Sequence, residues 1–163
     1  MIPDPAITVR SLHYSDLPQV IAIERRAFPT PWSLAMFVLE LSKPSGICLA
    51  SLDPSGALTG YLICSRYDQV WHLMNIAVDP GARRRGIGSR LLSEMIARAG
   101  ENTPLTLEVR TSNAGAIAMY ERFGFRSAGT RRRYYSDTGE DAVIMWRDAA
   151  ATPTASSSAG AGA

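Results

Sequence analysis

The segment VDPGARRRGIGSRLL, at residues 78–92, most constrains what this chain can fold into. An apolar run typical of a strand precedes it. A helix with one apolar stripe follows, and the stripe consists of Ile87, Leu91, Leu92, Met95 and Ile96. The free N–H groups at a helix start attract anions, and glycines let an anion approach the backbone closely. This order therefore predicts an anion-binding turn beside a sheet.

The remaining pattern predicts one α+β (mixed α/β) domain over residues 1–148. Strands are expected at 6–10, 46–52, 56–67, 70–78, 105–110, 125–135 and 140–148, and helices at 15–28, 33–42, 86–100 and 113–124. Ser15, Ser33 and Asn113 are the expected N-caps of three of these helices. One central, mostly antiparallel sheet should contain a single parallel step between the fourth and fifth strands, flanked by about four helices. Residues 149–163, rich in Ala, Ser and Gly, are predicted to form a disordered tail.

Composition excludes several classes of protein. A net charge of +2 is too small for a general nucleic-acid binder. No segment approaches the length of a membrane span, so a soluble, cytoplasmic protein is expected. Cys48 and Cys64 lie in apolar runs, which favours small buried side chains over a disulfide in a reducing compartment. His13 and His72 have no partners at a metal-ligand spacing, so neither a metal site nor other chemistry is assigned to them.

Four interpretations of the loop RRRGIG compete. It could be a solvated charge run beside a turn. A nucleotide P-loop is excluded, because Ser89-Arg90 follow Gly88 where a lysine and a hydroxyl residue are needed. A dinucleotide fingerprint fits weakly, because Leu91 replaces its third glycine. Nucleic-acid binding would combine residues 83–85 with residues 131–135, but no nucleic-acid motif accompanies them.

The fourth interpretation is a cradle for the pyrophosphate of coenzyme A. The longer stretch NIAVDPGARRRGIGSRLL resembles the signature loop of the GCN5-related N-acetyltransferases (GNAT), which hold acetyl-CoA between a strand, this turn and a helix start. The resemblance implies a GNAT-like fold and acetyl-CoA as co-substrate, without a metal. The cofactor-binding residues that it implies are Ile76, Ala77, Val78, Arg83, Arg84, Arg85, Gly86, Ile87, Gly88, Ser89 and Asn113.

A second resemblance extends from Ile7 to Arg147. The stretches LEVRTSNAGAIAMYERFGF, RRRYY and GEDAVIMW resemble the RimI-type N-terminal alanine acetyltransferases of bacterial ribosomal proteins. The stretch ERRAFPTPWS resembles their substrate loop, although Thr30-Pro31 lengthen it by one residue. The resemblance implies transfer to the N-terminal alanine of a small-subunit ribosomal protein, without direct nucleic-acid or membrane binding. Glu108 would be the base and Tyr120 the acid, with Phe28, Trp32, Tyr134 and Tyr135 lining the peptide channel.

The residues themselves agree with base catalysis. An α-amine has a pKa near ~8, so at neutral pH much of it is protonated and cannot attack a thioester. Glu108 alternates with Leu105, Leu107 and Val109 and should therefore face away from them. No cysteine lies in the predicted site, which favours direct attack by the amine. A backbone N–H at the edge of residues 76–78 would polarise the acyl carbonyl.

Other roles for the same residues stay open. Glu108 could pair with an arginine, Tyr120 and the four aromatic residues could pack in the core, and Asn113 could act only as an N-cap. The acceptor could also be a lysine side chain or a small-molecule amine, because the fold does not define it. A third hypothesis is a coenzyme A-binding or RNA-associated module without turnover. The oligomeric state is not predicted.

Overall fold

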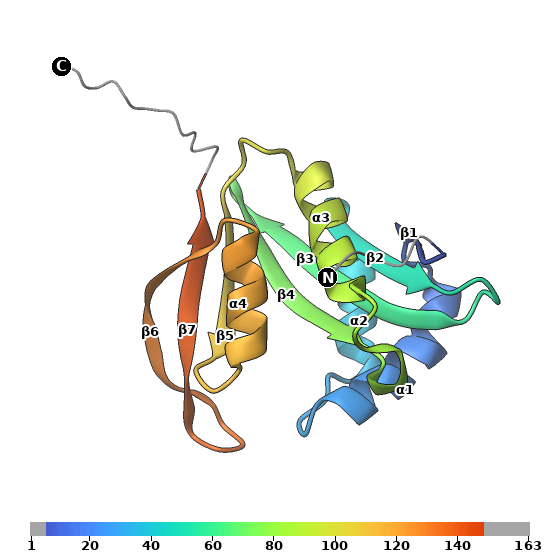
Figure 1. Ribbon diagram of the computed structural model, residues 1–163, viewed down its shortest axis with the longest axis horizontal. Helices are drawn as coiled ribbons and strands as arrows, with labels where there is room; N and C mark the ends of the chain where they lie inside the picture. The colour runs from blue at the N-terminus through green and yellow to red at the C-terminus, as the bar shows by residue number, and fades with distance from the viewer. Residues whose placement is uncertain (1–5, 149–163) are drawn as a thin grey trace.

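One sheet organises the chain in the computed structural model, which describes residues 6–148 (Figure 1). The seven strands of this region lie in the order β1-β2-β3-β4-β5-β7-β6. Their bounds are β1 Thr8–Ser11, β2 Gly46–Leu52, β3 Leu58–Tyr67, β4 Val70–Val78, β5 Leu105–Arg110, β6 Arg126–Tyr135 and β7 Glu140–Arg147. Only β4 and β5 pair in parallel, which confirms the predicted sheet. The expected tail at 149–163 lies outside the described residues.

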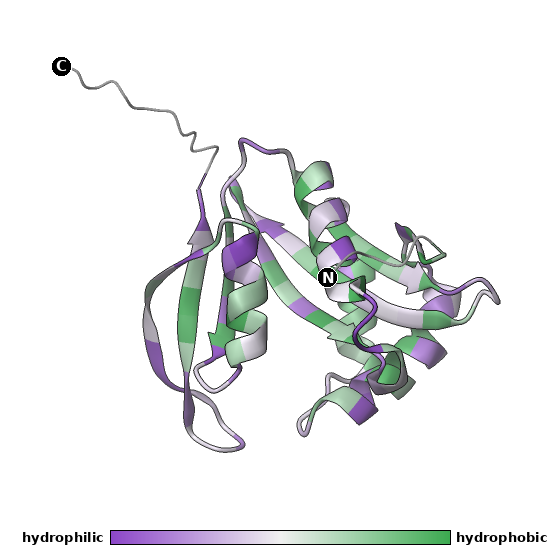
Figure 2. Cartoon of the chain, viewed as in Figure 1, coloured by the Kyte–Doolittle hydropathy of each residue, from purple (hydrophilic) through white to green (hydrophobic). Residues whose placement is uncertain are grey.

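Helices cover both faces of the sheet. Helices α3 (Ile87–Ala99) and α4 (Ala114–Arg122) pack on one face, and α1 (Leu17–Ala27) and α2 (Leu34–Ser42) pack on the other. Each face has its own cluster of buried apolar side chains, and Figure 2 shows green, apolar segments along the central strands and purple, hydrophilic stretches on β6. All five residues of the predicted stripe on α3 are buried. The sequence pattern therefore identified the buried face of α3 correctly.

Two of the three predicted N-caps are confirmed. Ser33 accepts a hydrogen bond from Met36 N at the start of α2, and Asn113 accepts one from Ala116 N at the start of α4. The prediction for Ser15 is wrong. A short 3-10 helix, η1 (Tyr14–Asp16), takes up that segment, and α1 begins only at Leu17. Asp16 is buried there and accepts from both Arg10 and the His13 backbone, so the tertiary contact outweighs local capping.

The parallel pair β4–β5 separates soon after it begins. The two strands are in register only at Trp71↔Leu105 and His72↔Thr106, although β4 continues to Val78 and β5 to Arg110. Figure 1 shows the two strands diverging from this point. Beyond it, β5 pairs only with β7, and β4 only with β3. The divergence opens a wedge in the middle of the sheet.

A β-bulge in β4 lies at the wedge. Ile63 of β3 pairs with Asn75 and Cys64 pairs with Leu73, so Met74 is the extra residue. Two consecutive side chains then point to the α1 side: Met74 packs in the cluster of that face, and Asn75 hydrogen-bonds to Glu24 of α1. A bulge bends its strand and increases the local twist. It therefore helps to turn β4 away from β5.

Candidate active site

A cleft of about 360 Å³ occupies the wedge between β4 and β5. Its floor comes from residues 73–76 of β4 and residues 107–110 of β5. Side chains from the α1–α2 loop, α4 and the β6–β7 hairpin complete its walls. Eight residues that the sequence predicted as catalytic, substrate-binding or cofactor-binding line this one cleft: Phe28, Trp32, Ile76, Glu108, Asn113, Tyr120, Tyr134 and Tyr135.

Glu108 lies on the cleft side of β5, opposite the apolar face of that strand. Its Oε1 is 2.7 Å from Nε2 of His72, and its Oε2 is 3.7 Å from Nε of Arg131 on β6. The hydrogen bond with His72 and the nearby Arg131 guanidinium hold the pKa of Glu108 below its ordinary value, although partial burial acts in the opposite direction. Glu108 is therefore ionised throughout the neutral pH range. The alternative pairing with a hairpin arginine is present as the contact with Arg131, and Glu108 also lines the cleft.

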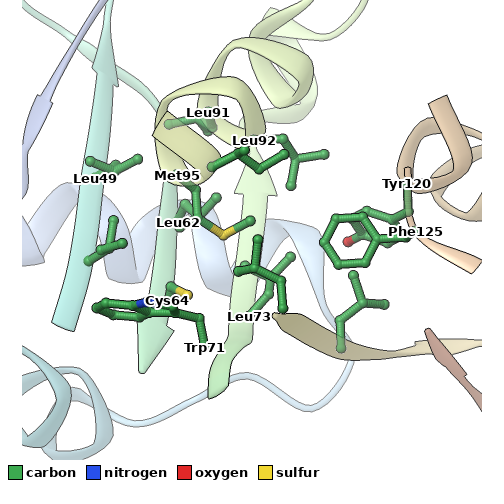
Figure 3. Packing of buried hydrophobic residues seen from close by; sticks show 14 of the residues in the cluster. Leu49, Leu62, Cys64, Trp71, Leu73, Leu91, Leu92, Met95, Tyr120 and Phe125 are labelled. Carbon is green, nitrogen blue, oxygen red and sulfur yellow. The ribbon is translucent and has the colours of Figure 1, made fainter. Parts of the chain in front are cut away.

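Tyr120 projects from α4 into the cleft. Its ring lies edge-on to Phe125 with centroids 5.9 Å apart and belongs to the core cluster of the α3–α4 face (Figure 3). Among the described residues, no hydrogen bond to its hydroxyl is formed. Burial raises the pKa of this phenol above its ordinary value, so the hydroxyl keeps its proton at neutral pH. Tyr120 is thus both a packed ring, as the structural alternative proposed, and a protonated group lining the cleft.

Aromatic side chains stand on two sides of the cleft. Phe28 and Trp32 come from the α1–α2 loop, and Tyr134 and Tyr135 come from the end of β6. The two tyrosine rings contact each other edge-on at 5.0 Å, and the Arg110 guanidinium lies 4.0 Å from the centroid of Tyr135. Sequence reasoning placed all four at the acceptor side, and the fold brings them to one cleft from segments about 100 residues apart.

Glu24 is a cleft residue that the sequence reasoning missed. It is almost fully buried on α1, and its carboxylate accepts hydrogen bonds from Tyr61 Oη, from Asn75 Nδ2 at 2.9 Å and from the Trp32 backbone N–H at 2.8 Å. These neutral donors fix the start of the α1–α2 loop against the sheet. A signal was present, because Glu24 follows Val20 by four residues and interrupts the apolar stripe of that helix.

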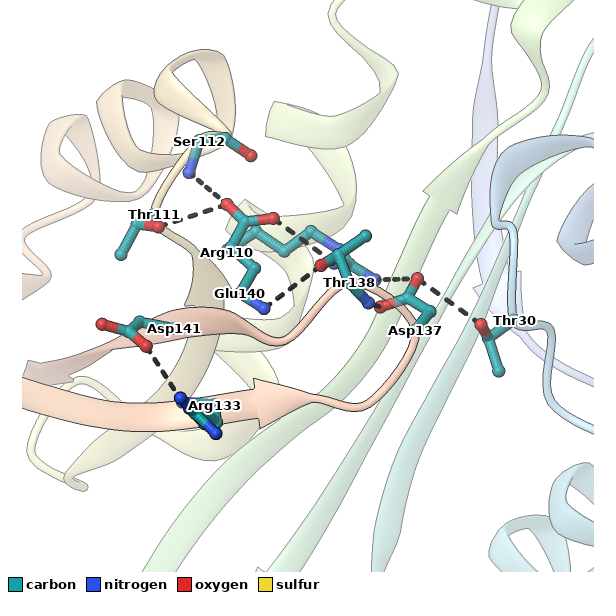
Figure 4. Close-up of polar contacts among 9 residues, drawn as sticks. All are labelled: Thr30, Arg110, Thr111, Ser112, Arg133, Asp137, Thr138, Glu140 and Asp141. Carbon is teal, nitrogen blue, oxygen red and sulfur yellow. Dashed lines mark hydrogen bonds and ion pairs between the residues drawn. The ribbon is translucent and has the colours of Figure 1, made fainter.

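The mouth of the cleft is bridged by a polar cluster (Figure 4). Arg110 Nη2 lies 2.8 Å from Oδ2 of Asp137 in the β6–β7 turn, and Thr30 Oγ1 of the α1–α2 loop lies 3.5 Å from the same oxygen. Arg110 also reaches Glu140 at 3.4 Å. The sequence reasoning assigned no role to Asp137. The sequence gives only a weak indication of such a role for Asp137, because the side chain of an Asp in a turn normally hydrogen-bonds to the backbone of that turn.

The predicted cofactor loop connects β4 to α3. Asp79 caps the 3-10 helix η2 (Pro80–Ala82), and Gly86, with a left-handed φ of +71°, is the N-cap of α3. Arg84 also has a positive φ of +70°. A Cβ on Gly88 would lie 3.2 Å from Sδ of Met119 on α4, so the glycine lets the Met119 side chain pack closely against the start of α3. Residues 83–85 are exposed and form no ion pair within residues 6–148.

Of the other predicted cofactor residues, two have structural roles of their own. Ala77 is buried in the cluster of the α1–α2 face, and Ile87 is buried in the cluster of the α3–α4 face. Their side chains therefore point away from the loop surface, which leaves their backbone groups as the available contacts. Val78 ends β4, and Ser89 lies in the first turn of α3. From Leu73 to Val78 no backbone pairing with β5 is formed.

Other candidate sites are not supported within the described chain. Residues 6–148 contain no group of three or more His, Cys, Asp or Glu side chains arranged around a possible metal ion. Cys48 and Cys64 are both free, and neither lines the cleft. The helices between residues 6 and 148 include none of the length and apolar character that a membrane span requires.

Comparison with known proteins gives consistent results. Residues 17–125 match the acetyltransferase (GNAT) family. The ribosomal protein bS18-alanine N-acetyltransferase of Escherichia coli strain K12 is 39% identical over 142 residues, which cover 85% of this chain and 95% of that protein. The N-alpha-acetyltransferase RimI of Mycobacterium tuberculosis is 37% identical over 150 residues, covering 87% and 92%.

Solved structures agree with this match. The crystal structure of the Escherichia coli ribosomal-protein-S18-alanine N-acetyltransferase superposes with a TM-score of 0.79 at 39% identity, covering 86% of this chain and 92% of the other. A phosphinothricin acetyltransferase from Sinorhizobium meliloti, solved in complex with acetyl-CoA, superposes with a TM-score of 0.74 at 25% identity, covering 88% and 89%.

Proposed function

This chain belongs to the acetyltransferase (GNAT) family and is of its RimI type, and from that premise we propose that it acetylates the N-terminal alanine of a ribosomal protein of the bS18 kind. The family makes it an acetyl-CoA dependent N-acetyltransferase. Relatives at 39% and 37% identity that are named for this kind of reaction support the acceptor. The observation that carries the proposal is the cleft itself, which presents a carboxylate, a protonated phenol and aromatic walls together.

The acceptor side of the cleft suits a cationic amine. Glu24, Glu108 and Asp137 line it, and Phe28, Trp32 and the two tyrosines add ring faces. Carboxylates attract an ammonium group, and aromatic faces bind cations with a further modest energy. An N-terminal alanine has a small side chain that leaves its amine close to the floor. A bulky first residue would meet the aromatic walls.

Glu108 is proposed to take the proton from this amine. Its carboxylate is already ionised at neutral pH, so it can accept a hydrogen bond from the ammonium as soon as the acceptor binds. Transfer of one ammonium proton to Glu108 frees the nitrogen lone pair, which then attacks the acetyl carbon. A low pKa makes Glu108 a weak base in equilibrium terms, and its contribution comes from its fixed position beside the amine.

Tyr120 is proposed to supply the proton that the departing sulfur needs. A thiolate has a conjugate pKa near ~8.5, so protonation helps it to leave at neutral pH. Tyr120 retains its proton there because it is buried. Tyr120 lines the cleft from α4, whereas Glu108 lines it from β5, so the proposed acid and base come from different walls. This separation suits a reaction in which one group gives and the other takes a proton.

The residues of the β4–α3 loop fit acetyl-CoA. The bound co-substrate supplies the acetyl group as an activated thioester. The N–H groups at the start of α3 and the exposed arginines at 83–85 are the groups proposed to bind its phosphates. The unpaired edge of β4 from Leu73 to Val78 can hydrogen-bond an extended arm lying in the wedge.

Direct attack is proposed, without an acetylated enzyme. Both cysteines lie away from the cleft, and burial raises the pKa of Cys48 to about 11. A thiol with a raised pKa is a poor nucleophile, because only the thiolate attacks.

A panel of acceptors tests the proposal. Peptides beginning with Ala, the same peptides with a blocked N-terminus and an internal lysine, and small primary amines are each incubated with acetyl-CoA. Release of free thiol gives the rate, and mass spectrometry locates the acetyl group. We expect transfer only to the free α-amine of the Ala peptides. Acetylation confined to lysine or to small amines would contradict the proposed acceptor. Thiol release without acetylation of any acceptor would contradict acetyl transfer to an amine altogether.

A further inference from the structure

His72 lies behind Glu108 on the same face of the sheet. It pairs with Thr106 across the last parallel pair of β4 and β5, and Glu108 is two residues further along β5. Residues two apart on a strand face the same side, so His72 and Glu108 are diagonal neighbours at the point where the strands separate. Its Nε2 lies 2.7 Å from Oε1 of Glu108, and about a quarter of its side chain is exposed.

We propose that His72 is a positioning residue, whose ring N–H fixes the Glu108 carboxylate in the orientation and ionised state required of the base. This inference rests on the proposed role of Glu108. An ionised carboxylate can only accept hydrogen bonds, so the hydrogen in this contact is carried by Nε2. A Glu side chain has several rotatable bonds, and holding one rotamer in a half-open cleft requires a partner of this kind.

The other neighbours do not supply the same restraint. Arg131 approaches Glu108 only at 3.7 Å from an exposed position on β6, so it adds charge without fixing the carboxylate. Tyr134 lies close enough for Glu108 to raise its pKa further, and it remains a neutral phenol. The His72 contact is shorter and comes from inside the sheet. It is the strongest hydrogen bond formed by Glu108 in the described chain.

His72 is itself held on its far side. Its ring meets Tyr67 of β3 edge-on with centroids 6.4 Å apart, and Lys43 contacts the Tyr67 ring and hydroxyl. Lys43 in turn pairs with Glu40 of α2, which also binds Ser65 of β3. Within residues 6–148 the charged and titratable groups around His72 are therefore Glu108, Arg131, Lys43, Glu40 and the tyrosines at 67 and 134. These contacts restrict the ring and leave only Nε2 bonded to the cleft.

The test compares His72→Phe, which retains a ring of similar shape but lacks the donor, with His72→Gln, whose amide nitrogen can occupy a position near Nε2. For the Phe variant we expect kcat to fall roughly 10-fold with an unchanged KM for acetyl-CoA, as for loss of an orienting partner. We also expect the acidic limb of the kcat–pH profile to move up by about one unit, because a partner that favours the ionised form of Glu108 is lost. Gln should restore most of kcat.

Combination with Glu108→Gln separates this inference from the proposed function. If His72 acts through Glu108, His72→Phe lowers kcat in the wild-type background and has no further effect in Glu108→Gln. His13→Ala, at an exposed position outside the cleft, is the matched control and should be as active as the wild type. If His72→Phe does not fold, as judged by circular dichroism, His72→Ala takes its place.

Three outcomes would overturn the inference. The first is a Phe variant with wild-type kcat and acidic limb. The second is an equal loss in the Phe and Gln variants, and the third is a loss that persists in the Glu108→Gln background; both would indicate a purely structural role. Full activity of the Glu108→Gln variant alone would instead contradict the proposed role of Glu108 as the base. The two failures are thus distinguishable.

Discussion

At the scale of single residues, two carboxylates in one cleft have different surroundings. Glu24 is almost completely buried and is surrounded by neutral donors. Glu108 is bonded to His72, lies near Arg131 and remains at the cleft surface. A buried charge is tolerated when several hydrogen bonds satisfy it, which makes it part of the wall. A carboxylate with one firm partner keeps lone pairs free for an acceptor.

Replacing Glu108 by Gln should reduce kcat by about 10²- to 10⁴-fold, the usual contribution of a general base. The affinity for acetyl-CoA should stay unchanged, because Glu108 lies on β5 and away from the β4–α3 loop. Steady-state kinetics and calorimetry measure the two quantities. In the wild type, kcat should fall with decreasing pH only when the pH is below the ordinary pKa of a Glu side chain, because the pKa of Glu108 is lowered in the folded protein. A wild-type rate for the variant across neutral pH would place the base elsewhere.

Replacing Tyr120 by Phe should lower kcat by roughly 10- to 100-fold, because the proton donor is lost. The edge-on contact with Phe125 survives, and no hydrogen bond to the hydroxyl is broken within the described residues. Thermal unfolding should therefore change little. Acyl donors whose thiols are more acidic provide the control. Such thiols leave more easily without protonation, so the substitution should lower kcat less with these donors than with acetyl-CoA. An equal loss for all donors would argue against an acid role.

At the scale of elements, the site depends on two backbone irregularities. The bulge at Met74 helps to turn β4 away from β5 and places Asn75 beside Glu24. The left-handed Gly86 lets the chain turn from the loop into α3 with its first N–H groups exposed. The bulge helps to open the cleft, and Gly86 shapes the loop proposed to bind the phosphates of acetyl-CoA. Neither adds to the hydrophobic core.

Replacing Gly86 by Val should weaken acetyl-CoA binding by about 10-fold or more, because a β-branched residue at φ +71° forces the loop to rearrange. The same strain should lower the free energy of unfolding by roughly 1–2 kcal/mol. Calorimetric titration and denaturant unfolding measure the two effects. Gly81→Ala is the matched control, since Gly81 has free space and no positive φ. Unchanged affinity in the Val variant would contradict the proposed cradle.

At the scale of the whole molecule, the acceptor side of the cleft is assembled from distant parts of the chain. The α1–α2 loop and the β6–β7 turn meet through Thr30 and Asp137, which are 107 residues apart. The chain order β5-β7-β6 places the hairpin over the open end of the wedge. The cleft therefore exists only when the sheet is complete.

Replacing Asp137 by Asn should raise KM for the acceptor peptide by roughly 2- to 5-fold, because the exposed ion pair with Arg110 and the charge at the mouth are lost. The kcat value and the KM for acetyl-CoA should stay close to wild type, since Asp137 is remote from the β4–α3 loop. Increased salt should reduce the difference between the two proteins by screening. A variant that loses kcat but keeps its acceptor KM would show that Asp137 acts on the chemistry instead.

Prediction from the sequence succeeded where a signal is local. The stripe on α3, the cap residues Ser33 and Asn113 and the alternation around Glu108 are all set within one or two turns or one strand. The prediction for Ser15 was wrong, because Asp16 forms a partly buried ion pair with Arg10 and a 3-10 turn occupies the segment instead. Glu24 was missed because its three donors come from three other segments.

The sequence by itself determined the order of strands and helices and singled out the β4–α3 turn, Glu108 and Tyr120 as candidates, because periodicity, glycine positions and side-chain type are properties of short segments. The tertiary structure alone decided where β4 and β5 separate and that His72 meets Glu108 at that point. It also decided that Thr30 meets Asp137. These contacts depend on strand register and on the bulge at Met74, which are selected by the packing of the whole sheet between its two layers of helices.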